Sequence, residues 1–205
     1  MDEELNKLPQ EPAEASPEEK REERPGHTVF EWLQMAMGCI LIAVICFNCV
    51  ARLSRVDGHS MDPTLQHGEL MVVRSLGYHP KQGDVVVLNK TVAEFLGGPG
   101  GEAIVKRVIA LGGQTVDIDY EANQVSVDGV PLEEPYILEE MWWPGDPYMQ
   151  GTHFVVPEGE IFVMGDNRNG STDSRHEWLG TVNEDYLLGK AQLAIFPPEC
   201  FGPIR

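Results

Sequence analysis

A serine and a lysine on separate segments are the side chains of this sequence best suited to covalent chemistry on a carbonyl group. Ser60 lies in VDGHSMDPTL, where Gly58 permits an unusual backbone angle and Pro63 fixes the backbone after the serine. A serine on such a rigid turn can act as a nucleophile if a base takes its proton. His59 is a poor base for it, because neighbours in an extended segment point to opposite sides.

Other sources of a base find little support in the sequence. The segment does not match the G-x-S-x-G elbow, because Asp62 stands where the second glycine is required. His153 and His176 could complete a Ser-His-Asp set, but no sequence feature places either of them near Ser60. Taken alone, the segment also fits an ordinary surface turn.

Lys106 lies in AIVKRVIAL, a segment that is apolar except for two adjacent cations. Period-two alternation predicts one cation on each face of a strand: Ile104, Lys106, Val108 and Ala110 on one face, and Val105, Arg107, Ile109 and Leu111 on the other. A charged ammonium on an apolar face is costly, and lowering a lysine pKa from about 10.4 to about 8 costs about 3 kcal/mol. A neutral lysine is a competent general base, although a strand-edge lysine that reaches solvent gives the same pattern.

Residues 165–175, GDNRNGSTDSR, are dense in turn-forming residues and hydrogen-bonding side chains. A calcium loop is a poor interpretation, because Arg168 puts a cation where an oxygen ligand is required. Asp166, Asp173, Arg168 and Arg175 could instead satisfy one another in a buried polar network. A solvated loop is the alternative.

Composition excludes several classes of protein. The 205 residues include 33 acidic and 15 basic ones, and this net charge of −18 argues against a general nucleic-acid binder. Cys39, Cys46 and Cys49 lie in one apolar run, so Cys200 has no partner for an intradomain disulfide framework. Neither paired C-x-x-C motifs nor H-E-x-x-H occurs, so we expect no metal site and no cofactor.

The chain divides into three regions, and the first two lie before Ser60 in the sequence. Residues 1–27 are rich in acids and prolines, which predicts a disordered tail. Residues 32–50 carry no charge, and a helix of that length spans about 29 Å, close to the ~30 Å of a bilayer core. We therefore predict a transmembrane helix at residues 32–51. A buried core helix, a cleaved signal peptide and a lipoprotein signal ending at Cys39 are the weaker alternatives.

Residues 52–205 form the third region, which we expect to be mainly β. Short segments rich in valine and isoleucine are separated by glycine, proline, asparagine and aspartate, and no strongly periodic helix is evident. The predicted strands lie within residues 68–74, 83–90, 103–111, 114–119, 123–129, 153–157, 160–166 and 190–196. Their spacing suggests a barrel-like or folded-sheet domain.

Four motifs follow the apolar segment in this order: SMDPTL, GDVVV, KRVIALGG and GDNRNGSTDSR. Over roughly residues 30–200 they resemble the bacterial type I signal peptidases. The resemblance implies the mainly β signal-peptidase fold, shared with LexA-like repressors, together with one N-terminal transmembrane helix. It also implies that a Ser/Lys dyad removes signal peptides from secreted preproteins, cleaving after Ala-x-Ala sites through an acyl-enzyme.

The same resemblance assigns roles to individual residues. It makes Ser60 the nucleophile, Lys106 the general base and Ser171 the residue whose hydroxyl orients the lysine. Met61 adjoins the nucleophile and is expected to contact substrate. Gly58 stands where some members carry a serine that donates to the oxyanion, so we expect backbone N–H groups, including that of Ser60, to form the oxyanion hole.

Supporting ion pairs are also implied by the resemblance, between Asp166 and Arg107 and between Asp173 and Arg175. One departure concerns residues 110–114, where ALGGQ replaces the common G-L-P-G-D. The missing proline and aspartate lie outside the dyad, so we expect the difference to concern the local loop geometry and not the catalysis.

The resemblance further implies a place in the bacterial cell membrane, with a cytoplasmic N-terminus and an extracytoplasmic catalytic domain. The expected partners are secreted preproteins and the lipid bilayer, with the secretion translocon as a further candidate and no nucleic acid. Trp142 and Trp143 could lie in the membrane interface, although loop packing explains them equally well. Two other functions stay open: a LexA-like autoprotease, and a non-catalytic anchored β module in which Ser60→Ala would change nothing.

Overall fold

The computed structural model describes residues 25–45, 51–89, 103–142, 145 and 147–205. Helix α1 spans Pro25–Ile45, and proline suits the first helical position because its missing N–H would be unpaired there anyway. Within the described residues, no helix reaches the length and hydropathy of a membrane span. The predicted span at 32–51 includes residues 46–50, and the predicted tail includes residues 1–24; both of these stretches lie outside the described residues.

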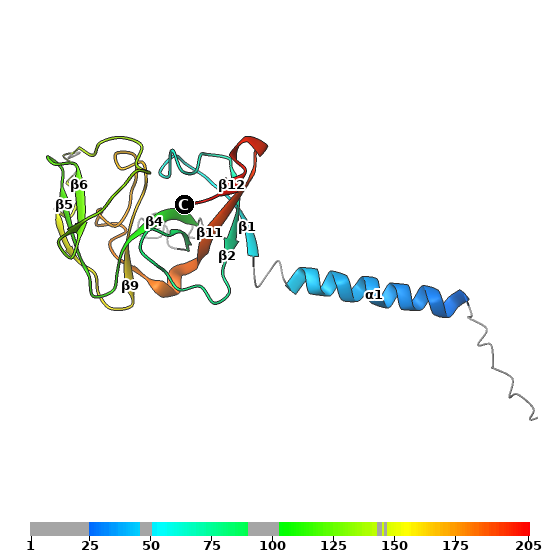
Figure 1. Cartoon of the computed structure of the whole chain (residues 1–205). Coiled ribbons are helices and arrows are strands. Elements are labelled where there is room, and N and C mark those ends of the chain that lie inside the picture. The colour runs from blue at the N-terminus through cyan, green and yellow to red at the C-terminus, as the bar shows by residue number, and fades with distance from the viewer. Residues whose placement is uncertain (1–24, 46–50, 90–102, 143–144, 146) are drawn as a thin grey trace, which may run out of the picture. The chain divides into compact units, whose positions relative to one another are not determined.

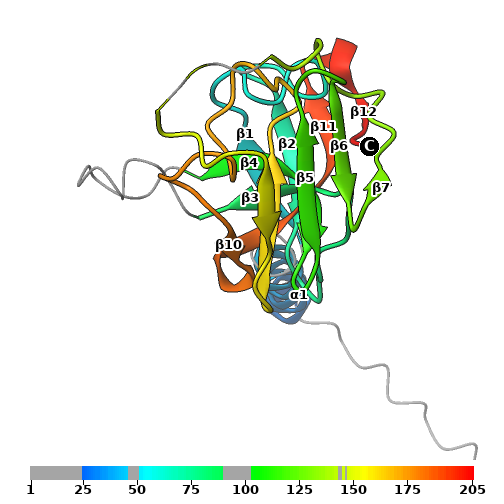
Figure 2. The same ribbon diagram turned by 90° about the vertical axis from the view of Figure 1, so that its left-hand side faces the viewer.

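Twelve antiparallel strands, joined by turns and loops, form the framework of the described chain after helix α1 (Figures 1 and 2). They are β1 (Ala51–Arg55), β2 (Leu70–Arg74), β3 (Val85–Leu88), β4 (Ile104–Leu111), β5 (Thr115–Asp119), β6 (Gln124–Val127), β7 (Val130–Pro131), β8 (His153–Val155), β9 (Glu160–Met164), β10 (Val182–Asn183), β11 (Leu187–Phe196) and β12 (Gly202–Pro203). Two short 3₁₀ turns lie at Glu184–Tyr186 and Pro198–Cys200. Each of the eight predicted segments contains a strand, so the mainly β prediction is confirmed.

The strands form two sheets. The larger has the order β1-β2-β11-β3-β4-β9-β10, with β12 paired to β11, and the smaller has the order β7-β6-β5-β8. Strand β4 lies near the middle of the larger sheet, between β3 and β9, and runs on through a short turn into β5 of the smaller sheet. The lysine strand is therefore held on both edges by hydrogen-bonded neighbours.

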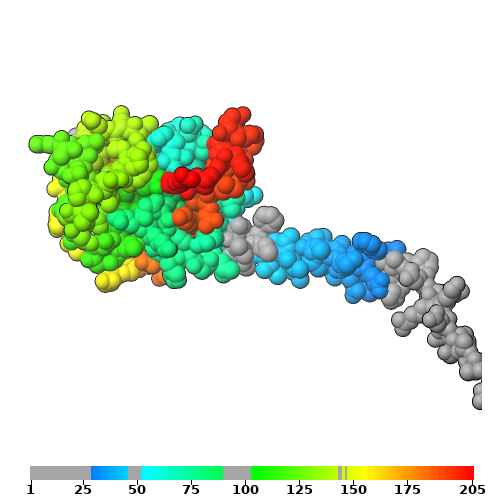
Figure 3. Space-filling view, in the orientation of Figure 1, coloured from blue at the N-terminus to red at the C-terminus, as the bar shows by residue number. Residues whose placement is uncertain are grey.

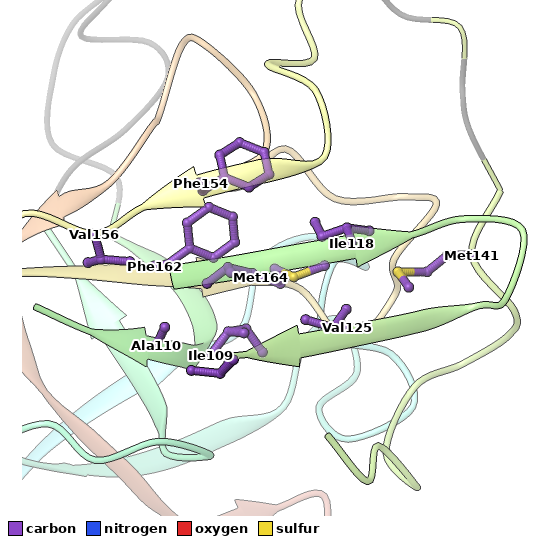
Figure 4. Packing of buried hydrophobic residues seen from close by; sticks show 11 residues of the cluster. Ile109, Ala110, Ile118, Val125, Met141, Phe154, Val156, Phe162 and Met164 are labelled. Atoms are coloured by element: carbon purple, nitrogen blue, oxygen red, sulfur yellow. The ribbon is translucent and has the colours of Figure 1, made fainter. Parts of the chain in front are cut away.

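Buried apolar side chains fill the space around this junction. One cluster joins the end of β4 to β5, β6, β8 and β9, and Phe154 and Phe162 pack within it with ring centroids 4.8 Å apart (Figure 4). A second cluster contains residues of β2, β3 and β11 together with Met61 and Leu65, which follow Ser60 in the sequence. Burial of these two side chains fixes the serine segment to the sheet.

The predicted alternation along β4 fails after Val108. The pairing with β9 shifts register between Val108 and Ala110, and Ile109 and Ala110 belong to the same buried cluster. Leu111 instead packs on the cluster that contains Val108. A β-bulge of this kind adds a residue to one strand, which reverses the face of every later side chain. Lys106 and Arg107 precede the bulge, and there the predicted opposite faces are retained.

The turn after β4 is closed by Gln114, which stands at one of the positions where the sequence departs from G-L-P-G-D. The Gln114 side chain accepts a hydrogen bond from the Leu111 N–H at 2.9 Å and donates to Asp128 at 2.9 Å. Gly112 lies against the next turn, where a Cβ atom would come within 2.9 Å of the Gly159 nitrogen. The altered sequence therefore forms a well-defined turn of its own.

Candidate active site

Ser60 lies in the turn that connects β1 to β2. Gly58 has a φ of +92°, a conformation that favours glycine, as the sequence predicted. The Leu65 N–H donates to the Met61 carbonyl at 3.0 Å, which closes a turn directly after the serine. Met61 is only 1% exposed, so its side chain serves the core in this structure, and its contact with substrate stays a prediction.

Lys106 meets Ser60 across this turn. Its Nζ atom lies 2.7 Å from the Ser60 Oγ atom, and the lysine is 4% exposed. Burial lowers the pKa of Lys106 to about 8; Asp173 and Asp166 favour the charged form, while Arg175 opposes it. About one lysine in ten is then neutral at pH 7 and able to accept the serine proton.

Ser171 reaches the same place from the 165–175 segment. A Cβ atom on Gly165 would overlap both the Ser171 Oγ atom and the main-chain oxygen of Ser60, so these groups surround the glycine closely. The Ser171 hydroxyl is buried and makes no hydrogen bond to any described residue. Its orienting action on Lys106 therefore stays a prediction.

The first predicted ion pair is formed and buried. Arg107 donates to both carboxylate oxygens of Asp166, at 2.8 and 2.6 Å, and its guanidinium lies 3.9 Å from the ring centroid of Tyr136. Arg107 Nη1 also donates to the Gly83 carbonyl at 2.8 Å, and the Thr64 hydroxyl donates to Asp166 at 2.5 Å. Both members of the pair are almost fully buried, and their charges compensate each other.

The second predicted ion pair is also formed. Arg175 donates to the two oxygens of Asp173 at 2.8 and 2.9 Å, and Asp173 accepts the Gly165 N–H at 3.0 Å. Burial raises the pKa of Asp173, but the adjacent Arg175 outweighs it, and the net pKa is lowered. Arg175 also donates to the Arg168 carbonyl at 2.6 Å, which ties the two ends of the loop together.

The Arg168 side chain pairs with neither Asp166 nor Asp173, the two acids of the network that its sequence position suggested. It donates to Glu134 at 2.9 and 2.5 Å instead, and to the Gly165 carbonyl at 3.1 Å. Sequence reasoning missed Glu134, because no motif marks an acid 34 residues away as the partner of this arginine.

A second missed residue is Asn167, which joins the 165–175 loop to the turn that contains Ser60. Its main-chain N–H donates to the Ser60 carbonyl at 3.1 Å, and its side-chain nitrogen donates to the His59 carbonyl at 3.1 Å. The loop therefore holds the carbonyl groups of Ser60 and of the residue before it.

The histidines considered as bases are engaged elsewhere. His59 pairs with Asp62 at 3.0 Å and His153 pairs with Asp117 at 2.6 Å, in both cases at the surface. His176 packs against Tyr148 and Trp178, with ring centroids 5.8 and 4.5 Å away. The described residues include no cluster of three histidine, cysteine or acidic side chains that could hold a metal ion.

Known proteins share this sequence pattern over most of the chain. The family model described as signal peptidase, peptidase S26, matches residues 29–196. A probable signal peptidase I-1 from Synechocystis sp. is 36% identical, over 88% of this chain and 89% of that protein. Signal peptidases I from Mycobacterium tuberculosis and Bacillus licheniformis are 32% and 31% identical, over 87% and 91% of this chain and 76% and 97% of their own lengths. A solved signal peptidase I from Enterococcus faecalis is 27% identical, with a TM-score of 0.42 over 55% of this chain and 97% of that chain.

Proposed function

Because the chain belongs to the signal peptidase family, peptidase S26, we propose that it is a membrane-anchored serine endopeptidase that removes signal peptides from secreted preproteins. The observation that carries this proposal is the 2.7 Å hydrogen bond between Lys106 and Ser60 within the matched region. It joins a nucleophile to a base whose pKa of about 8 suits proton transfer near neutral pH.

The chemistry depends on these two side chains. Neutral Lys106 takes the proton of Ser60, and the Oγ atom attacks the carbonyl carbon of the scissile peptide bond. The main-chain N–H of Ser60 is the candidate donor to the oxygen that becomes negative. Lys106 then protonates the leaving amine, which departs as the mature protein and leaves an acyl-enzyme on Ser60. The lysine next takes a proton from water, and the hydroxide releases the signal peptide and regenerates the serine.

The substrate proposal is cleavage after Ala-x-Ala. A peptide bound in extended form presents alternate side chains to the same face, so two small pockets can read the first and third residues of such a site. Substrate is delivered from the membrane, in which residues 32–51 anchor the enzyme. The N-terminus is then cytoplasmic and the catalytic domain extracytoplasmic.

Cleavage of a preprotein tests the activity and the dyad together. The full-length chain in detergent is compared with Ser60→Ala, with Lys106→Met, which keeps the side-chain length, and with Lys81→Met as an exposed lysine control. We expect cutting after the last alanine by the wild type and by Lys81→Met, and no cutting by the other two. Cleavage of the preprotein by Lys106→Met would contradict the proposed role of the lysine as the base. Fragments of the enzyme itself, in place of cleaved preprotein, would indicate an autoprotease.

Extraction of membranes with alkaline carbonate tests the anchor. The uncharged stretch 32–50 predicts that the chain stays in the membrane pellet, as an integral protein does. A chain that lacks residues 1–50 serves as the comparison and is expected in the supernatant. Release of the full-length chain by carbonate would argue against a span.

A further inference from the structure

The end of the chain lies against the catalytic domain beside the predicted active site. Residues 202–205, which we call the C-terminal strap, begin with β12, whose Gly202 pairs with Ala194 of β11. The Ile204 N–H then donates to the Gln192 carbonyl at 3.0 Å. In Figure 3 the strap, coloured red, crosses the visible face of the domain.

The strap ends on the arginine that holds Asp166. Arg107 Nη2 donates to the main-chain oxygen of Arg205 at 3.0 Å. The same nitrogen donates to Asp166 at 2.6 Å, and its contact with the Thr64 hydroxyl is longer, at 3.4 Å. Because Nη2 carries two hydrogens and one is directed to Asp166, the Arg205 oxygen is the nearer acceptor for the other.

Burial makes this acceptor important. Arg107 is 1% exposed, and a buried N–H that loses its partner carries a free-energy penalty. Without the strap, the guanidinium could satisfy this N–H only by moving towards Thr64 or by admitting water. Either change would alter the position of the Asp166 carboxylate, which accepts two hydrogen bonds from Arg107.

A shift of Asp166 would also move its two neighbours in the sequence, which contact Ser60. Its neighbour Gly165 lies against the Ser60 main chain, and its other neighbour, Asn167, donates to the Ser60 carbonyl at 3.1 Å. The strap and the nucleophile turn are therefore linked through Arg107 and three consecutive residues.

We propose that the C-terminal strap is a positioning element of the active site, in which the main-chain oxygen of Arg205 fixes Arg107 and, through Asp166, the turn that carries Ser60. The proposal rests on the proposed function as a Ser/Lys peptidase. It assigns the effect to the main chain of the strap and gives the Arg205 side chain no part in it.

Two variants separate the main chain from the side chain. A chain that stops at Ile204 loses the acceptor, whereas Arg205→Ala retains it. We expect the shortened chain to cleave preprotein with kcat reduced about tenfold and KM changed less than twofold, and Arg205→Ala to stay within twofold of the wild type in both. Wild-type kcat in the shortened chain would overturn the proposal, and so would an equal loss in Arg205→Ala.

If the shortened chain fails to fold, Ile204→Ala carries the test. The Ile204 side chain packs on the buried cluster that contains Met61 and Leu65, so its truncation loosens the strap while keeping the Arg205 oxygen. We expect a kcat about threefold lower at an unchanged KM, and an unchanged kcat would contradict the proposal.

Hydrogen exchange of the Arg107 Nε proton, observed by ¹⁵N NMR, gives a reading that does not depend on turnover. This proton donates to Asp166 at 2.8 Å and should exchange at least about tenfold faster in the shortened chain or in Ile204→Ala than in Arg205→Ala. Equal exchange rates of this proton in all variants would overturn the proposed role of the strap, even if the chain cleaves preproteins. Faster exchange in a chain that never cleaves would support the strap and refute the proposed function.

Discussion

The Lys106 Nζ atom lies 2.7 Å from the Ser60 Oγ atom, although the two residues are 46 positions apart in the sequence. The lysine reaches this position from the central strand β4, and the serine reaches it from a turn fixed by Met61 and Leu65. The contact places a buried base with a lowered pKa against a hydroxyl group. Such a pair should affect the pH dependence of cleavage and the free energy of unfolding. Substitutions close to the pair should therefore change activity or stability.

Cleavage should depend on pH through Lys106. Its pKa of about 8 means that the neutral base gains population as the pH rises to that value. We expect kcat/KM on a soluble peptide to rise about tenfold per pH unit between about pH 6 and 7.5 and to level off above about pH 8.5. A flat profile across this range would show that proton transfer to a group of this pKa does not control the reaction.

The same lysine should make the folded state less stable below pH 8. Its pKa is lower in the folded chain than in the unfolded one, so the unfolded chain binds more protons between about pH 8 and 10.4, and stability rises with pH across that window. Lys106→Met removes the penalty and should increase the free energy of unfolding by up to about 3 kcal/mol at pH 7.

Urea unfolding of the wild type and Lys106→Met at about pH 7 and pH 10.5 measures this difference. The gain should shrink to near zero at the higher pH, and Lys81→Met, at an exposed position, should change stability by less than about 0.5 kcal/mol at either pH. A loss of stability in Lys106→Met at pH 7 would contradict the interpretation.

Gly165→Ala should impair catalysis strongly. The added Cβ atom would overlap the Ser171 Oγ atom and the Ser60 main-chain oxygen, so the turn that carries Ser60 and the 165–175 loop must move apart. We expect kcat to fall by about a hundredfold or more with the β domain still folded. Gly38→Ala, where a Cβ would meet nothing within 4 Å, is the control and should leave kcat unchanged. Activity near the wild-type level in Gly165→Ala would show that this contact is not important.

Breaking the buried ion pair should cost far more stability than breaking an exposed one. Arg107→Met leaves the Asp166 carboxylate buried without its partner, for an expected loss of about 3–5 kcal/mol. Asp117→Asn weakens the surface pair with His153 and should cost less than about 1 kcal/mol. Urea unfolding at pH 7 compares the two. Similar losses would mean that water or other groups compensate Asp166.

The sequence alone determined the β-rich class and the strands that carry the chemistry. Period-two alternation over residues 104–108 placed Lys106 and Arg107 on opposite faces of a strand, since this pattern depends only on local backbone geometry. Glycine at position 58 indicated the positive φ, and the order of the motifs indicated the family and its ion pairs.

Tertiary structure decided what local pattern cannot encode. The bulge after Val108, the pairing of Arg168 with Glu134 and the hydrogen bond from Asn167 to Ser60 all depend on which segments meet in space. The lowered pKa of Lys106 likewise requires burial, which only the folded domain provides, close to Asp173, Arg175 and Asp166 of a loop distant in the sequence. A sequence specifies the groups that can bond, but only the folded chain brings them within bonding distance and removes the water between them.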